Sequence, residues 1–156
     1  MSAPLLEVEG VTKRFRGLTA VNAVSFAVPE GSIFAVIGPN GAGKTTLFNV
    51  IAGVFRPDEG DVRFAGRSIA GLAPEQTCGA GIARTFQIVR PFKELSVEEN
   101  VMVGALRTDP DVERGRAAAL RVLERLELAD RRHQRAGALT LPDRKRLEVA
   151  RALATG

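Results

Sequence analysis

The glycine-rich segment Gly38–Thr45 (GPNGAGKT) constrains the fold of this chain more than any other feature. It follows an apolar run, Ser32–Ile37, and it opens the segment Lys44–Gly53, in which Leu47, Phe48, Val50 and Ile51 recur at helical spacing. We therefore expect a strand over Ser32–Ile37 that is buried on both faces, then a loop, then a helix that stops at Gly53.

The same segment fits the pattern G-x-x-x-x-G-K-[ST], in which each residue type has a chemical reason. Glycines let consecutive backbone N–H groups point at phosphate oxygens, and the helix that follows turns its positive end toward the same anion. Lys44 would add a charge for the β- and γ-phosphates, and Thr45 would offer a hydroxyl to Mg²⁺. The alternative is a glycine-rich turn that binds nothing, but the position between a strand and a helix favours a phosphate site.

Shorter patterns predict the remaining elements. Strands are expected over Leu5–Glu9, Ala23–Val28, Val62–Phe64 and Gly81–Phe86, because β-forming residues there are bounded by glycine and proline turns. Ser96 and Glu99 form a capping-box pattern that opens a helix, a long helix is expected over Asp111–Leu128, and a last helix is expected from about Pro142. We expect a mixed α/β part over residues 1–92, a helical part over 93–138, and a returning segment with its helix over 139–156.

Composition limits the ligands and the cellular compartment that we expect for the protein. The net charge of +4 suits anionic ligands or a membrane surface without requiring either. The single cysteine, Cys78, cannot form an internal disulfide, so we expect a reducing compartment and a small, partly buried side chain. The acidic residues near the N-terminus argue against a signal peptide, and no apolar run approaches the ~18 residues of a membrane span.

Several stretches together resemble the ABC-transporter ATPases: VTKRF, GPNGAGKTTLFNVIAG, RPDEGDVRFAG and RTFQ. The stretch GIARTFQIVRPFKELSVEENVMVGAL is similar to the branch that serves branched-chain amino acid uptake in bacteria. The resemblance implies an α/β P-loop NTPase of ABC type with N-terminal antiparallel strands and an inserted helical subdomain, here truncated. It also implies ATP and Mg²⁺ as ligands.

The resemblance further implies partners and a location. It predicts integral-membrane permease subunits, a second ATP-binding subunit that is identical or different, and indirectly a periplasmic binding protein, with the chain on the cytoplasmic, inner face of the bacterial membrane. The segment Ile88–Val103 would contact the permease through Val89, Phe92, Leu95 and Val97. No nucleic acid is expected, because the arginines near residues 131–146 suit a solvated helix surface and no Trp, Tyr or late Phe accompanies them.

Matching positions carry over individual roles. Phe15 would stack on adenine, with a core phenylalanine as the alternative, and Thr46 would contact the α-phosphate. Gln87 would reach the metal beside Thr45, with a solvated surface amide as the alternative. The implied ATP-binding set is Phe15, Gly38, Pro39, Asn40, Gly41, Ala42, Gly43, Lys44, Thr45, Thr46 and Gln87, of which Thr45 and Gln87 would hold Mg²⁺.

The segment Leu139-Thr140-Leu141-Pro142-Asp143 occupies the place of the family's signature, which contacts ATP held by the other subunit. Leu141 and Pro142 replace two glycines, and Asp143 replaces glutamine. Leucine limits close backbone approach and proline removes a donor. We nevertheless expect Thr140 to cap the helix, with proline tolerated in its first turn.

The family pattern continues with an Asp at the end of an apolar strand, a catalytic Glu and later a switch His, and none of these is found in the 156 residues. Asp130 and His133 do not replace them, since neither has the right surroundings. No catalytic residue is therefore assigned, and we expect a fragment that is inactive alone. Two alternatives stay open: a soluble ABC ATPase acting on nucleic acid or ribosomes, and a non-catalytic nucleotide-binding fragment.

Overall fold

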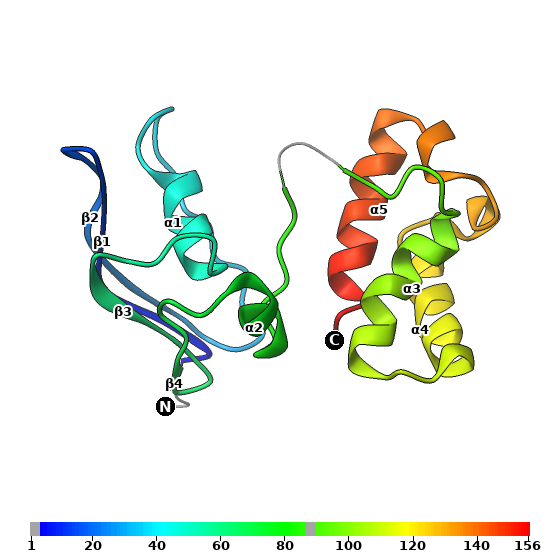
Figure 1. The fold of residues 1–156 in the computed structure, drawn as a ribbon, viewed down its shortest axis with the longest axis horizontal. Helices are drawn as coiled ribbons and strands as arrows, with labels where there is room; N and C mark the ends of the chain where they lie inside the picture. The colour runs from blue at the N-terminus through cyan, green and yellow to red at the C-terminus, as the bar shows by residue number, and fades with distance from the viewer. Residues whose placement is uncertain (1–3, 87–89) are drawn as a thin grey trace. The chain divides into compact units, whose positions relative to one another are not determined.

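The computed structural model describes residues 4–86 and 90–156 (Figure 1). The chain divides into two compact units, residues 1–82 and 83–156. Within the described residues, the first unit contains four strands and two helices, and the second contains three longer helices with two short 3₁₀ turns. Gln87, Ile88 and Val89 lie outside the described residues.

The first unit is built on an antiparallel sheet with the strand order β2-β1-β3-β4. Its strands are β1 (Leu6–Phe15), β2 (Leu18–Val28), β3 (Glu59–Phe64) and β4 (Arg67–Ser68). The hairpin between β1 and β2 turns at Gly17, whose φ of 89° favours glycine. The antiparallel N-terminal strands are thus confirmed, and β1 and β2 extend beyond the predicted ranges.

Helix α1 (Lys44–Ile51) packs on this sheet, as the sequence predicts. Leu47, Val50 and Ile51 are buried on the face that the helical spacing indicated. The chain leaves the helix at Gly53, where φ is 77° and an added Cβ would lie 2.5 Å from the carbonyl oxygen of Leu72. The short helix α2 (Pro74–Gly79) follows, and Cys78 within it is half-buried, as expected for a small side chain without a special role.

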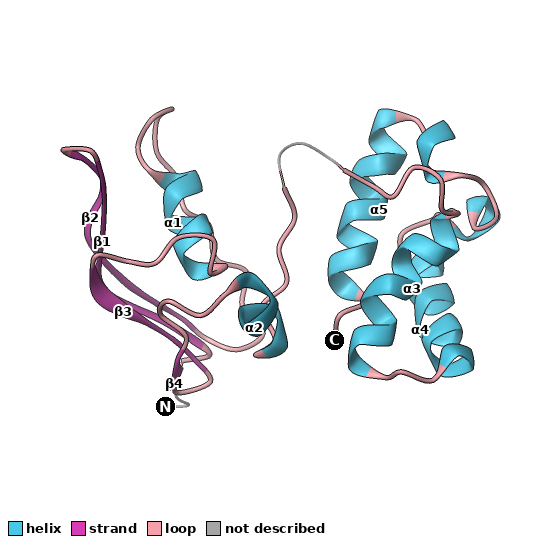
Figure 2. Cartoon of the chain, viewed as in Figure 1, coloured by secondary structure: helices cyan, strands magenta, loops and turns pink. Residues whose placement is uncertain are grey.

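Two predicted strands do not form in the described structure. Ser32–Ile37 and Gly81–Phe86 are drawn as loop in Figure 2 and are not in the sheet. Ile33 and Ile37 are almost fully exposed, at 103% and 93%. Apolar composition alone does not make a strand, because a strand also needs a neighbouring backbone to pair with, and neither segment pairs with any of the four described strands.

The second unit is a helical cluster formed by α3 (Val97–Thr108), α4 (Val112–Arg125) and α5 (Leu141–Leu153). Its apolar core draws on all three helices, with Val101, Leu123 and Leu147 fully buried. The predicted capping box at Ser96 is confirmed: the Ser96 hydroxyl accepts from the N–H of Glu99, and the Glu99 carboxylate accepts from the N–H of Ser96. The long helix is shorter than predicted, because Asp111 caps it and Leu126 ends it.

In the described part of the chain, no helix is both long and apolar enough to cross a membrane.

Candidate functional site

The loop between Gly38 and Gly43 leads directly into α1, as the sequence pattern requires. Gly41 and Gly43 both have φ of 84°, a left-handed conformation that L side chains rarely adopt. The Lys44 ammonium folds back across the loop and donates to the carbonyl oxygens of Gly38 at 2.6 Å and Pro39 at 2.7 Å. These contacts fix a positive charge at the mouth of the loop.

Gly43 packs against strand β2, and this close contact fixes the position of the loop on the sheet. A Cβ added to Gly43 would lie 2.0 Å from the carbonyl oxygen of Ala20 and 3.4 Å from a Val21 methyl. A pocket of about 350 Å³ lies beside this contact. It is lined by Thr19, Ala20, Val21, Asn22, Val24, Val36, Ile37, Ala42, Gly43, Lys44 and Leu47.

The N-terminus of α1 suits an anion. Its N-cap is Gly43, which has no side chain to accept from the first N–H groups, and its first turn contains no acidic residue. The first N–H groups of a helix have no partners within the helix, and the helix dipole makes this end positive. Together with the Lys44 ammonium, the loop therefore presents donors and positive charge, and Thr45, which is exposed, adds a hydroxyl at the same place.

Phe15 lies at the hairpin end of β1, where it pairs with Leu18 of β2. Two residues after Leu18 comes Ala20, the residue that Gly43 touches, so the hairpin end and the loop are neighbours. In Figure 1 the hairpin and the loop before α1 lie at the same end of the first unit. Phe15 is 37% exposed, and its ring meets the Phe55 ring edge to face. The side chain is therefore partly covered by a neighbour without being buried in the core.

The segment Leu139–Asp143 starts α5 in the second unit. Leu139 is buried, whereas Thr140, Leu141 and Pro142 are exposed. The Thr140 hydroxyl accepts from the N–H of Asp143, and Pro142 lies in the first turn, so the predicted cap is confirmed.

Asp143 itself is buried and held by neighbours that the sequence analysis missed. The Thr140 hydroxyl donates to its carboxylate at 2.5 Å, and the Arg131 guanidinium is in direct contact with it. The hydroxyl first, and the positive charges of Arg131 and Arg146 second, hold the pKa of Asp143 below its ordinary value. This carboxylate therefore anchors the start of α5.

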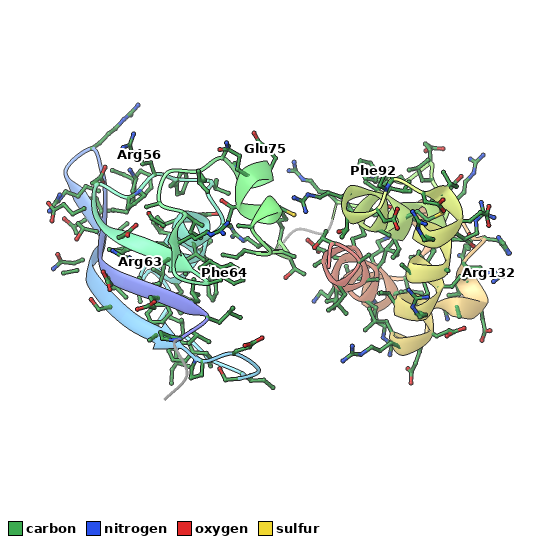
Figure 3. The ribbon with its side chains drawn as sticks, turned by 90° about the horizontal axis from the view of Figure 1, so that it is seen from below. Arg56, Arg63, Phe64, Glu75, Phe92 and Arg132 are labelled. Atoms are coloured by element: carbon green, nitrogen blue, oxygen red, sulfur yellow. The ribbon has the colours of Figure 1, made fainter. Side chains whose placement is uncertain are left out.

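Gln87 lies outside the described residues, and α5 holds the described chain before and after it. The N–H of Phe86 donates to Glu148 at 2.6 Å, and Arg151 donates to the carbonyl of Arg90 at 3.1 Å. Arg151 also lies over the ring of Phe92, 4.7 Å from its centre. Phe92, labelled in Figure 3, is 46% exposed.

One predicted contact residue does not fit the expected surface. Val97 is fully buried in the helical core, so it cannot contact a permease as predicted. The reason is that Val97 opens α3 and faces inward, since its neighbour Ser96 fixes the start of the helix. His133 is exposed and accepts from the Arg132 guanidinium at 3.0 Å.

The donor set around the loop fits a polyphosphate better than a protein-bound metal. Within residues 4–86 and 90–156, no group of three or more His, Cys, Asp and Glu side chains could hold a metal ion. Thr45 is the described residue that could contact Mg²⁺, and it would share the ion with phosphate oxygens. The residues present therefore fit Mg²⁺ only as the companion of a bound nucleotide.

Comparison with known proteins places this geometry in a family. The family model described as ABC transporter matches residues 21–156. The chain is 41% identical to the high-affinity branched-chain amino acid transport ATP-binding protein LivG of Salmonella typhimurium, over 99% of this chain and 67% of that protein. It is 40% identical to the corresponding protein BraF of Pseudomonas aeruginosa, with the same coverage.

A solved structure agrees with these matches. MJ1267, described as an ATP-binding cassette of an ABC transporter, superposes with a TM-score of 0.87 at 34% identity, over 99% of this chain and 66% of that one. The chain thus spans about two thirds of the length of the relatives it matches.

Proposed function

The chain belongs to the ABC transporter family of ATPases, and from this membership we propose that it is the ATP-binding part of a transport ATPase. The observation that carries the proposal is the loop Gly38–Gly43, which opens α1 without a side-chain cap while its own carbonyls hold the Lys44 ammonium. Such a site offers directed N–H groups, a helix N-terminus and one fixed cation to a polyphosphate.

Each residue of the loop region has a role in this proposal. The backbone of Gly38–Thr45 surrounds the phosphates, and Lys44 binds the β- and γ-phosphate oxygens. Thr45 and Gln87 would hold Mg²⁺, which would neutralise phosphate charge when it is bound. Thr46 donates to the α-phosphate, and Phe15 stacks on adenine.

We extend the proposal to the transported substrate and the partners. The names of the relatives LivG and BraF specify branched-chain amino acid transport, which supports an importer of such amino acids for this chain. Two ATP-binding subunits would pair so that Leu139–Asp143 of each faces the nucleotide of the other. The pair would act on permease subunits at the inner face of the membrane, and a periplasmic binding protein would deliver the substrate. The exposed ring of Phe92 supports a contact with the permease.

We also propose that the 156-residue chain alone binds nucleotide without appreciable turnover. Phosphoryl transfer needs positioned phosphates, a metal and an oriented water. The loop supplies the first and part of the second, but Asp143 is held by Thr140 and Arg131 and is not available to orient a water. Loss of a general base typically costs about 10²–10⁴-fold in rate. Phosphate release at about 1 s⁻¹ or faster, absent in Lys44→Ala, would reject this part of the proposal.

Nucleotide binding is tested by replacing the loop cation. Lys44→Ala removes the charge at the loop mouth, so the affinity for a fluorescent ATP analogue with Mg²⁺ is expected to fall at least tenfold, or about 1.4 kcal/mol. Lys93→Ala is the matched control, since Lys93 is an exposed lysine of the other unit. Equal affinities for Lys44→Ala and the unmodified chain would refute the assignment of the loop.

A further inference from the structure

The end of β1 is held by a side chain where its pairing with β3 stops. The last paired residues of the two strands are Thr12 and Glu59. Beyond them, the Asp58 carboxylate accepts from the backbone N–H of Arg14 at 2.6 Å and from the Lys13 ammonium at 3.0 Å. The N–H of Asp58 in turn donates to the carbonyl of Thr12 at 2.9 Å. Asp58 therefore fixes three consecutive residues directly before Phe15.

The Phe15 ring is fixed by the same segment of chain. Phe55, three residues before Asp58, meets it edge to face, with ring centres 5.2 Å apart and an angle of 73°. The N–H of Phe55 donates to the carbonyl of Asn49 in α1 at 3.2 Å. The segment that follows α1 thus connects the helix of the phosphate loop to the ring at the end of β1.

Asp58 also holds a cation over one face of the Phe15 ring. The Lys13 ammonium, held by Asp58, lies 5.5 Å from the centre of the Phe15 ring. A cation over one face of an aromatic ring is attracted to it, so a flat ligand would stack on the opposite face. With its edge against Phe55 and one face near Lys13, the ring of Phe15 has a defined orientation.

We propose that Asp58 is a positioning residue for the base of the nucleotide, holding the end of β1 so that Phe15 presents the face opposite Lys13 beside the phosphate loop. This inference rests on the proposed function, in which Phe15 stacks on adenine. Asp58 does not touch the ligand in this scheme and acts through Lys13, Arg14 and Phe15.

The charge state of the carboxylate agrees with this role. Hydrogen bonds from the Arg14 N–H first and from Lys13 second lower the pKa of Asp58, so it is ionised at neutral pH. The neutral isostere, Asp58→Asn, loses the attraction to Lys13 and can no longer accept with both of its side-chain atoms. The substitution therefore loosens the end of β1 without changing the size of the side chain.

The experiment separates the base from the phosphates. Calorimetric titrations with ATP and with tripolyphosphate, both with Mg²⁺, are run on the unmodified chain, Asp58→Asn, Phe15→Ala and the double variant. Asp58→Asn is expected to weaken ATP binding by roughly 2- to 10-fold, the range of an aromatic contact, with tripolyphosphate unchanged. In the Phe15→Ala background it is expected to have no further effect, because the ring it positions is gone.

Asp61→Asn is the matched control. Asp61 lies in β3, accepts from Ser68 at 2.6 Å and from Arg63 at 3.1 Å, and also has a lowered pKa, chiefly through the Ser68 hydroxyl. It joins β3 to β4 and does not contact the end of β1, so its replacement is expected to leave both affinities unchanged. This control distinguishes positioning of Phe15 from a general loss of a structural carboxylate.

The results that overturn the inference differ from those that overturn the proposed function. If Phe15→Ala weakens ATP selectively but Asp58→Asn is neutral, weakens both ligands equally, or adds its full effect to Phe15→Ala, only the role of Asp58 is rejected. If Phe15→Ala leaves the ratio of the two affinities unchanged, base stacking itself is rejected and Asp58 with it. Should Asp58→Asn fail to fold, Asp58→Glu, which keeps the charge but moves it, is measured with the same criteria.

Discussion

Replacing one or the other of two glycines in the phosphate loop isolates the contact between the loop and the sheet. Gly41 and Gly43 have the same φ of 84°, but an added Cβ meets nothing within 4 Å at Gly41 and the Ala20 carbonyl oxygen at 2.0 Å at Gly43. Gly41→Ala therefore costs only the left-handed conformation, about 1–2 kcal/mol. Gly43→Ala adds a clash that shortens an ordinary contact by about 1 Å, and overpacking of this kind costs about 1–3 kcal/mol more.

We therefore expect Gly43→Ala to lower the free energy of unfolding of the first unit by about 2–5 kcal/mol, and clearly more than Gly41→Ala. The measurement is urea unfolding without nucleotide, followed by circular dichroism, with the two midpoints compared at equal slope. Hydrogen exchange of the α1 amides reports whether the loss lies at the contact with β2. Equal destabilisation by the two substitutions would show that the close approach of Gly43 to Ala20 does not exist in solution.

Three further predictions concern the second unit. Asn100 is fully buried, and its amide accepts from the N–H of Phe92 and donates to the carbonyl of Phe92, both at 2.9 Å. Asn100→Ala should therefore lower the free energy of unfolding in urea by about 2–4 kcal/mol. Gln134→Ala, which removes an exposed amide of the same unit, should lower it by about 0.5 kcal/mol or less. Because the pKa of Asp143 is lower in the folded chain, the stabilisation that its carboxylate provides is complete above the unfolded pKa of about 3.9 and is lost as the pH falls through the folded value. The free energies of unfolding of Asp143→Asn and of the unmodified chain should therefore differ at about pH 5–7 and become equal in stronger acid. Cysteine introduced at Phe92 should cross-link to permease loops in the assembled transporter, and cross-links only from Arg67 in β4 would contradict the proposed contact.

Local signals in the sequence predicted the starts of α1, α3, α4 and α5 well, whereas α2 was not predicted. The reciprocal bonds of Ser96 with Glu99 and the cap of Thr140 span three residues, so the sequence alone specifies them. The phosphate loop is similar, since its glycines, lysine and helix start are consecutive. These elements were predictable because their partners are neighbours in the chain.

Contacts between distant residues were not predictable in the same way. Ser32–Ile37 has the composition of a buried strand, but pairing depends on which backbone lies beside it, and composition does not state this. The contacts of Asp143 with Arg131 and of Asp58 with Arg14 join residues far apart in sequence. An acidic residue in a turn or at a helix start is common, so nothing in the sequence distinguished these two as anchors. The division at residues 92 and 138 and the individual ligand contacts stay predictions.

The pairing of β1 with β3 imposes an order on how the nucleotide loop can form. β1 and β2 are joined by a short turn, and hairpins of this kind form within about 1–10 μs. Strand β3 reaches β1 only after β2, the loop and α1 have been traversed, so this second pairing closes a long loop and is entropically slower. Because Asp58 and Phe55 dock at that closure, we expect the base and phosphate ends of the site to acquire their spacing together and after the hairpin has formed. During synthesis on the ribosome, a nascent chain that has exposed Gly38–Thr45 but not yet β3 would carry the motif without a competent site.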